Sequence, residues 1–256
     1  MDQVFKPKFK LWFYVFDTMI GIAIIVLVYA SYHRIIATTQ SSSSVQSSQP
    51  LTTDVASEHL HGIDVSHYQG SVDWQGVSEK FHFAFIKATE GKHYVDPQLR
   101  NNINEIKDTS MNFSVYHFYT RDTDPVEQAR HFLEHTSAYD FTLPPVLDIE
   151  VHPGKDLAGF HDDIQQWLDK VSESTGCTPI IYTNKSFWNK YLKMRFSDYP
   201  LWISDYTSDQ GKIAGIPWSF WQYSDNSIVH GIGGHVDQSL YRGNEQSMRE
   251  LGSCRV

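Results

Sequence analysis

The feature that most restricts the fold of this chain is a succession of short, strongly apolar segments, with helical patterns between the early ones. These segments are rich in β-branched and aromatic residues, which favour strands. They cover residues 62–66, 83–87, 113–119, 146–150, 179–183, 201–204, 218–223 and 236–240. Helical patterns fall at residues 97–107, 125–135 and 157–173. This alternation predicts an α/β fold of one domain, a modified TIM-like β/α barrel with eight strands.

The fourth strand segment, Pro144 to Glu150, carries two acids. Successive side chains of a strand alternate between faces, so Asp148 and Glu150 point the same way and Ile149 points to the opposite side. Mutual repulsion and loss of water raise at least one carboxyl pKa, which suits a general acid beside an ionised carboxylate. The alternative is a strand end that emerges into water with two solvated acids.

Composition excludes some classes of function. The net charge of −9 argues against nucleic acid as a partner, because phosphate binding needs a basic face. Cys177 and Cys254 lack the spacing of a zinc site, and they either pair in an oxidising compartment or remain free thiols. There is no HExxH motif, and His131 and His135 are interpreted as surface residues of a helix. We therefore expect no metal and no cofactor.

The N-terminal part has a different character. Residues 1–37 contain three lysines followed by an apolar run from Leu11 to about Ala30, close to the ~20 residues that span a bilayer. This predicts a cytoplasmic tail and a transmembrane anchor, and a cleaved signal peptide is the alternative. Residues 38–58, rich in Ser, Thr and Gln, predict a flexible linker, and residues 59–256 are expected to form the barrel. Both alternatives export the barrel, either anchored to the membrane or secreted.

In β/α barrels, functional side chains collect at the carboxyl ends of the strands. The polar residues expected there are Asp64, Glu90, Tyr116, Asp148, Glu150 and Asp237. Aromatic side chains suit a sugar-binding cleft because sugar rings have apolar faces, although most aromatic residues belong to a core. Tyr116, Tyr182, Trp202 and Trp221 are candidates for sugar subsites on this ground, with barrel core as the alternative.

From about His61 to Gly243 the sequence resembles the glycoside hydrolase family 25 lysozymes, which are N-acetylmuramidases. The matching stretches follow one another in the family's order: residues 62–70, 72–74, 83–91, 116–118, 148–150, 181–184, 221–223 and 236–237. The resemblance implies an eight-stranded barrel with five or so helices. It also implies hydrolysis of the β-1,4 bond between N-acetylmuramic acid and N-acetylglucosamine in peptidoglycan.

Carried over to this sequence, the resemblance implies that Glu150 is the proton donor. Asp148 is implied to be its partner, either as a nucleophile or by orienting the acetamido group of the substrate. Asp64 and Asp237 are implied to be the remaining acids of the cleft. A glycosidic oxygen is protonated by an acid that stays neutral, so the more buried carboxyl is expected to serve as the donor.

The expected partners are peptidoglycan strands and, through the N-terminal helix, the membrane, and the expected state is a monomer. A different possibility is a catalytically weak, glycan-binding barrel that acts in cell-wall association. The intact acids Asp64, Asp148 and Glu150 argue against it, because a binding module has no need for a costly acid cluster.

Overall fold

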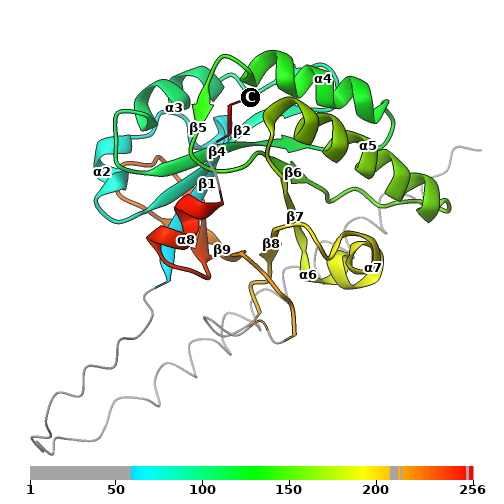
Figure 1. Ribbon diagram of the computed structural model, residues 1–256. Coiled ribbons are helices and arrows are strands. Elements are labelled where there is room, and N and C mark those ends of the chain that lie inside the picture. Colours follow the sequence, from blue (N-terminus) through cyan, green and yellow to red (C-terminus); the bar gives the residue numbers. More distant parts are fainter. Residues whose placement is uncertain (1–58, 208–212, 214, 252–253, 256) are drawn as a thin grey trace, which may run out of the picture. The chain divides into compact units, whose positions relative to one another are not determined.

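The eight predicted strand segments form the strands of a closed barrel in the computed structural model (Figure 1). The structure describes residues 59–207, 213, 215–251 and 254–255. The strands of the barrel are β1 (Leu60–Val65), β2 (Phe83–Glu90), β4 (Asn112–Phe118), β6 (Val146–Asp148), β7 (Ile180–Asn184), β8 (Leu201–Ser204), β9 (Phe220–Ile228) and β10 (His235–Tyr241). The barrel closes because β1 pairs with both β2 and β10. The predicted fold class is thus confirmed.

Strand direction differs around the barrel. All neighbouring pairs from β1 through β2, β4, β6, β7 and β8 to β9 are parallel. β10 is antiparallel to both of its neighbours, β9 and β1. The amino end of β10 therefore lies beside the carboxyl ends of the other strands, which matters for the acid that it carries.

Helices cover one part of the barrel more thickly than the other. They are α2 (Trp74–Ser78), α3 (Leu99–Ile106), α4 (Pro125–Thr136), α5 (Leu157–Thr175), α6 (Lys185–Phe187), α7 (Lys193–Phe196) and α8 (Glu245–Glu250), with a 3₁₀ turn η1 (His67–Gln69) and a π turn η2 (Trp188–Leu192). Figure 1 shows α3, α4 and α5 over β2, β4 and β6, while β8 and β9 lack a long helix beside them. This matches the expectation that helical segments lie between the early strands and that the later connections are short.

The helix boundaries follow from local chemistry. Asp124 accepts a hydrogen bond from the Glu127 amide at 2.9 Å, and Pro125 occupies the first helical position of α4. Helix α5 ends at Gly176, whose φ of 71° is easy only for a residue without a Cβ atom. The predicted helices at residues 97–107, 125–135 and 157–173 thus correspond to α3, α4 and α5.

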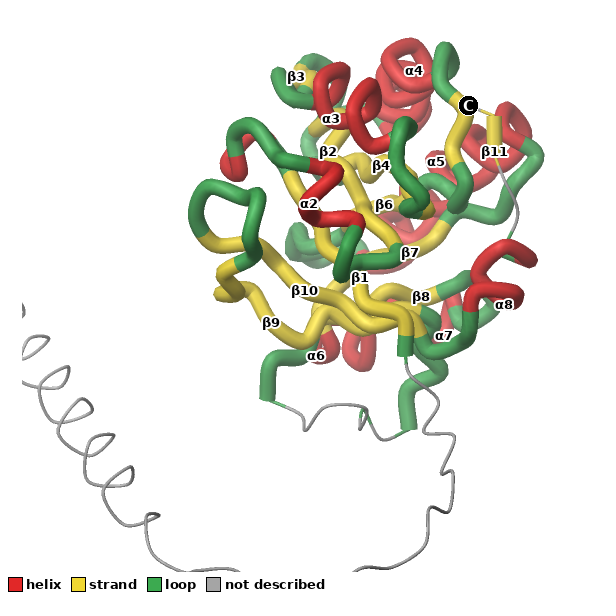
Figure 2. The backbone as a smooth tube through the Cα atoms, turned by 90° about the vertical axis from the view of Figure 1, so that its left-hand side faces the viewer, coloured by secondary structure: helices red, strands yellow, loops and turns green. Residues whose placement is uncertain are grey.

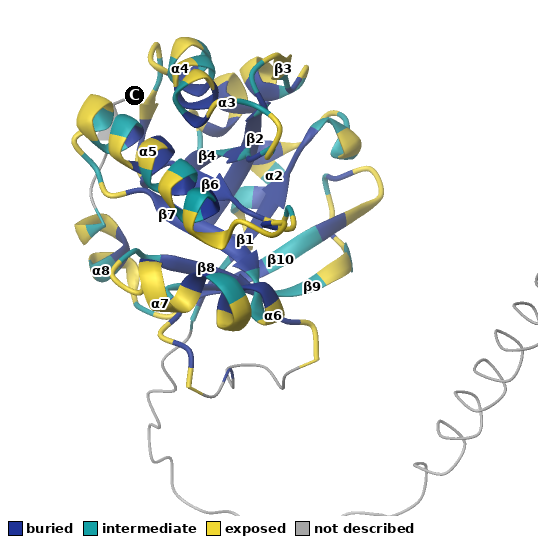
Figure 3. Cartoon of the chain, turned by 90° about the vertical axis from the view of Figure 1, so that its right-hand side faces the viewer, coloured by how far each residue is buried: buried dark blue, intermediate teal, exposed yellow. Residues whose placement is uncertain are grey.

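The core has two layers separated by the barrel wall. Aromatic side chains fill the barrel, with ring centroids 4.5 Å apart for Phe85 and Trp202 and 5.1 Å apart for Phe85 and Phe220. The second layer lies between the strands and the helices and includes Ile149 and Trp167. Figure 3 shows the buried faces of the helices turned toward the strands. Because strand residues alternate between the two layers, each polar residue of a strand is assigned either to the barrel mouth or to the outer shell.

Short strands complete the chain's path. β3 (Tyr94–Val95) pairs with β2, and β5 (Asp140–Phe141) pairs with β11 (Cys254–Arg255), which fixes the end of the chain to the barrel (Figure 2). Cys177 is disulfide-bonded, and the sequence contains one other cysteine, Cys254. This agrees with the paired alternative and not with free thiols.

The predicted anchor at residues 1–37 and the linker at 38–58 lie outside the described residues. Among the residues that the structure does describe, none of the helices has the length and apolar character needed to cross a membrane.

Candidate active site

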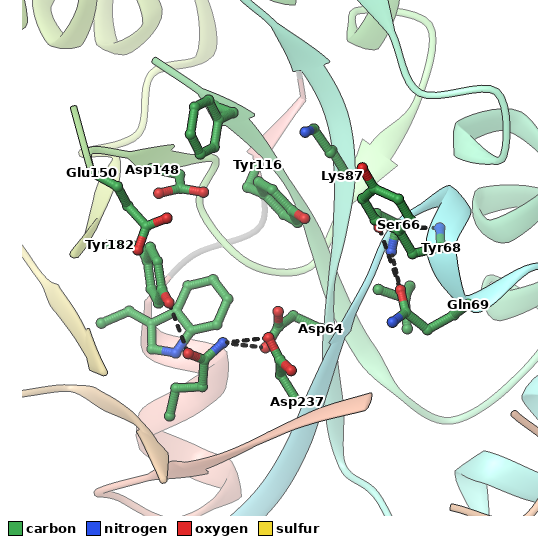
Figure 4. A pocket seen from close by; sticks show the side chains of 14 residues that line it. Asp64, Ser66, Tyr68, Gln69, Lys87, Tyr116, Asp148, Glu150, Tyr182 and Asp237 are labelled. Atoms are coloured by element: carbon green, nitrogen blue, oxygen red, sulfur yellow. Dashed lines mark hydrogen bonds between the residues drawn. The ribbon is translucent and has the colours of Figure 1, made fainter. Parts of the chain in front are cut away.

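An open cavity of about 260 Å³ lies at the mouth of the barrel, where the parallel strands end (Figure 4). It contains all four predicted acids and three of the four predicted aromatic residues. The lining residues are Asp64, Val65, Ser66, Tyr68, Gln69, Lys87, Tyr116, Phe118, Asp148, Glu150, Tyr182, Trp202, Gln222 and Asp237. Residues that are up to 173 positions apart in sequence, from Asp64 to Asp237, thus meet in one cleft.

Asp148 and Glu150 reach this cleft from the end of β6. The strand ends at Asp148, but its alternation continues: Ile149 is fully buried in the outer layer, and its amide donates to the Tyr182 carbonyl at 2.9 Å. Asp148 and Glu150 therefore lie on the same face of the strand, toward the cleft, as the alternation predicts. Asp148 is only 6% exposed, and its Oδ1 atom has no hydrogen-bond partner among the described residues. A buried carboxylate oxygen without a partner leaves an open position for a donor.

The surroundings raise the pKa of both acids. Burial raises the pKa of Asp148 well above its ordinary value, the charge of Glu150 raises it further, and the Lys87 ammonium partly opposes both effects. Lys87 is itself buried and donates to Glu90 at 2.6 Å. Loss of water raises the pKa of Glu150.

Glu150 is not the more buried acid of the pair, contrary to the expectation for a proton donor. It is exposed at the mouth of the cleft, whereas Asp148 lies deeper. The position is geometric in origin: Glu150 lies beyond the end of β6 and has the longer side chain, whereas Asp148 is the last residue of the strand. Partial desolvation nevertheless raises the pKa of Glu150, which is the direction that a proton donor needs.

Asp64 and Asp237 lie opposite each other on β1 and β10, as directly paired residues of the antiparallel ladder. Asp237 is near the amino end of its strand, so it reaches the cleft only because β10 runs against its neighbours. The two carboxyl groups are close enough for the ionisation of one to affect the pKa of the other.

The pKa values of this second pair are also raised. For Asp64 the main cause is burial and the next is the charge of Asp237, while a hydrogen bond from Gln222 acts in the opposite direction. Burial, with the charge of Asp225 as the second cause, raises the pKa of Asp237 to about 6. Both shifts favour the protonated form, so this pair holds a proton more readily than two solvated aspartates would.

Gln222 on β9 holds the second pair in place, and sequence analysis assigned it no role. Its Nε2 donates to Asp64 at 2.9 Å and to Asp237 at 3.3 Å. Its Oε1 accepts hydrogen bonds from the hydroxyls of Tyr182 and Tyr206, both at 2.7 Å. The two tyrosine donors fix which end of the amide faces the aspartates. The signal in the sequence is a lone amide between aromatic residues of an apolar strand, since a buried polar group needs partners.

The aromatic candidates divide between the two layers. Tyr116, Tyr182 and Trp202 line the cavity. Trp221 does not: it is fully buried in the outer layer, and its indole N–H donates to the Asp205 carbonyl at 2.9 Å. We therefore correct the prediction for Trp221, whose alternative interpretation as core is the one that fits. The strand alternation that brings Gln222 into the cleft turns Trp221 away from it.

Two further residues differ from expectation at the rim. Tyr68 lines the cavity with 79% of its side chain exposed, and its ring lies 4.0 Å from that of His67. No periodicity singles it out, because it sits on a turn after β1. Glu90 lies at the end of β2 as expected, but it pairs with Lys87 and is not among the lining residues.

Comparison with known proteins places this geometry in a family. Residues 63–232 match the model of glycosyl hydrolases family 25. The protein YegX of Escherichia coli O157:H7 is 35% identical over 200 residues, covering 76% of this chain and 74% of its own length. Lysozyme M1 of Streptomyces globisporus is 31% identical, covering 76% of this chain and 71% of its own.

Solved structures agree. A bacterial lysozyme from Streptomyces coelicolor aligns with a TM-score of 0.69 and 30% identity, over 75% of this chain and 96% of its own. A family 25 glycosyl hydrolase from Bacillus anthracis aligns with a TM-score of 0.67 and 27% identity, over 82% of this chain and 99% of its own. With the family model covering more than half of its length, this chain belongs to glycosyl hydrolases family 25.

Proposed function

We propose that the barrel is a lysozyme that hydrolyses the β-1,4 bond between N-acetylmuramic acid and N-acetylglucosamine in peptidoglycan. The observation that carries this proposal is the acid pair Asp148 and Glu150, which lies in an open cleft of the barrel mouth of a family 25 chain. The cleft is open rather than enclosed, which suits a polymer that must pass through it.

In this proposal Glu150 gives its proton to the glycosidic oxygen as the bond to C1 breaks. Its position at the mouth lets it reach the polymer, and loss of water raises its pKa, which favours the protonated form that the donor role needs. After the leaving sugar departs, the same carboxylate takes a proton from the water that attacks C1.

Asp148 is assigned to orient the acetamido group of the substrate. Its unpartnered Oδ1 offers an acceptor for the acetamido N–H, and the carbonyl oxygen of that group then attacks C1. A buried carboxyl with a raised pKa is a poor free nucleophile, which favours this role over direct attack. The acetamido oxygen forms an oxazolinium ring that water opens, so the β configuration is retained. An α-anomer as the first product, observed by NMR, would exclude this path.

The test uses the barrel alone, residues 59–256. The alignment with the lysozyme from Streptomyces coelicolor covers 96% of that solved chain, so that chain consists of little besides the barrel. This supports independent folding of the barrel. Purified peptidoglycan is digested with the wild type, with Glu150→Gln and with Glu173→Gln, an exposed acid of α5 outside the cleft. Mass spectrometry then identifies the reducing ends.

We expect reducing N-acetylmuramic acid from the wild type and from Glu173→Gln, and a loss of about 10²–10⁴-fold for Glu150→Gln. Reducing N-acetylglucosamine would mean a glucosaminidase instead. Binding without cleavage by any form would move the assignment to a glycan-binding barrel.

We also propose that residues 1–37 anchor the barrel to the membrane with the barrel outside the cytoplasm. Support comes from the apolar run after three lysines and from the disulfide-bonded Cys177, since disulfides persist in oxidising compartments. Protease added to intact cells should remove the barrel and leave a small membrane-bound fragment. Release of the untreated chain into the medium would support a cleaved signal instead.

A further inference from the structure

The last turns of α4 carry a cluster of side chains that the barrel's proposed chemistry does not use. His131, Glu134 and His135 each offer one ligand atom, and these atoms all lie within 4.8 Å of one another. The two imidazole rings are 4.7 Å apart between centroids and nearly perpendicular. In the sequence this spacing alone gave no reason to expect a metal. Figure 3 shows α4 with an exposed outer face.

One of these histidines is held in a defined orientation. His131 Nε2 lies 3.0 Å from the carbonyl oxygen of Tyr94 in β3. A carbonyl can only accept, so Nε2 carries the hydrogen and Nδ1 of the neutral ring carries the lone pair. A histidine that ligates a metal commonly donates its other N–H to a carbonyl or carboxylate in this way.

The surrounding charges also favour a cation. His131 and His135 lie in the final turns of α4, which ends at Thr136, and the carboxyl end of a helix has partial negative charge. Glu134 adds a full negative charge. The nearby Lys92 is paired with Glu127 at 2.9 Å and does not offset it.

We propose that His131, Glu134 and His135 bind a divalent transition-metal ion of the zinc type, with water completing the shell. Two imidazole nitrogens and one carboxylate are a donor set that such ions accept. Ligand atoms of a tetrahedral zinc ion are ~3.4 Å apart, given bonds of ~2.0–2.1 Å. The three side chains need only small rotations inward, which an exposed helix face permits.

Metal binding there has a structural consequence. His131 is tied to the backbone of Tyr94, and the Tyr94 hydroxyl lies 3.1 Å from His67 Nδ1 beside the cleft. An ion on His131 therefore fixes α4 against β3 and the rim. The proposal does not depend on the proposed hydrolase function, because the site is outside the catalytic cavity.

The test is calorimetric titration of Zn²⁺ into the untagged barrel, residues 59–256, with Co²⁺ absorption as a second readout. Variants are His131→Ala with His135→Ala, Glu134→Gln, and His230→Ala as a matched exposed histidine elsewhere. Circular dichroism and peptidoglycan cleavage check the fold of each.

We expect one saturable site in the wild type and in His230→Ala. The double histidine variant should bind at least about ten-fold more weakly, because loss of even a supporting hydrogen bond costs ~10–100-fold in metal affinity. Glu134→Gln should fall between them. Equal affinity of the double variant and the wild type, or no saturable binding by the wild type, would overturn the proposal.

Discussion

The cleft contains two pairs of acids that are built in different ways. Asp148 and Glu150 come from one strand end, two positions apart, and Asp148 Oδ1 has no partner among the described residues. Asp64 and Asp237 come from opposite ends of the chain and are tied together by Gln222. The first pair, called the open pair below, keeps an acceptor without a partner, whereas the second, called the tied pair, is hydrogen-bonded by the protein itself.

This difference suggests a division of labour. A group that acts on substrate must have a free lone pair or a transferable proton, while a group that is already bonded supplies a fixed charge and shape. Both pairs pay a desolvation cost, since burial is the first cause of the raised pKa of Asp148, Asp64 and Asp237. Breaking each pair separately should therefore give effects of different size and kind.

Substitution in the open pair, Asp148 and Glu150, should reduce activity more than substitution in the tied pair. Asp148→Asn keeps the shape but replaces an acceptor oxygen with an amide, which cannot orient an acetamido N–H in the same way. We expect kcat to fall by about 10²–10³-fold, while thermal stability at neutral pH should rise rather than fall, because the amide avoids burial of a charge. Asp122→Asn, an exposed aspartate outside the cleft, is the matched control. An Asp148→Asn enzyme within a few-fold of wild type would remove Asp148 from the mechanism.

Loss of the Gln222 side-chain amide should disturb the tied pair, Asp64 and Asp237, and lower activity. Gln222→Leu removes the donors to Asp64 and Asp237, and we expect a loss of roughly ten-fold in kcat/KM, or about 1.4 kcal/mol. Since the Gln222 hydrogen bond lowers the pKa of Asp64, its removal should move the acidic limb of the pH profile to higher pH.

A control separates positioning from packing in this experiment. Tyr206→Phe removes one of two donors to Gln222 Oε1 but keeps the bonds from Gln222 to the aspartates. Its pH profile should stay close to that of the wild type. If Gln222→Leu lowers activity without moving the pH limb, then Gln222 supports only the fold.

The same contrast explains what the sequence could predict. Asp148 and Glu150 are neighbours in one strand, so their common face follows from local alternation alone. The meeting of Asp64 with Asp237 depends on β10 running antiparallel, and strand direction leaves no mark in the apolar pattern. The strand-end rule places Asp237 at a carboxyl end of its strand, whereas the structure has it near the amino end of β10.

Gln222 and Trp221 show a second limit. The segment at 218–223 is apolar enough to be a buried strand, but a strand covered on both sides does not show which face is which. The sequence therefore leaves Trp221 open between cleft and core and gives Gln222 no role, whereas the structure buries Trp221 in the outer layer and brings Gln222 into the cleft. One fixed point, such as the cleft-facing Trp202 on the neighbouring strand β8, settles the alternation for the whole barrel wall.

Burial of Asp237 in the tied pair should make the free energy of unfolding depend on pH. The pKa of Asp237 is about 6 in the fold against an ordinary value of 3.8, so the folded state holds this proton more tightly. The stabilisation from proton binding is complete below about pH 4 and is lost as pH rises through 6. Asp237→Asn stays neutral throughout.

We therefore expect Asp237→Asn and wild type to melt at similar temperatures near pH 4, with the variant a few degrees more stable at pH 7. Thermal melts at several pH values measure this, and Asp122→Asn should show no such trend. A constant difference across the range would mean that the Asp237 proton is not linked to folding.

The smallest effect on activity should come from the far side of the barrel wall. Trp202 and Trp221 lie on adjacent strands, but Trp221 pairs with Ile203 of the outer layer, so the two indoles point to opposite sides. Trp221→Phe loses one buried hydrogen bond to the Asp205 carbonyl and should cost about 1–3 kcal/mol of stability with KM unchanged.

Trp202→Phe loses a comparable bond, to Ser239 at 3.0 Å, together with part of the cleft surface. Melting temperatures should therefore fall for both variants, while KM on peptidoglycan rises only for Trp202→Phe. An equal rise in KM for Trp221→Phe would mean that the outer layer shapes the cleft, and the separation between the open and the protein-held sides of the wall would fail.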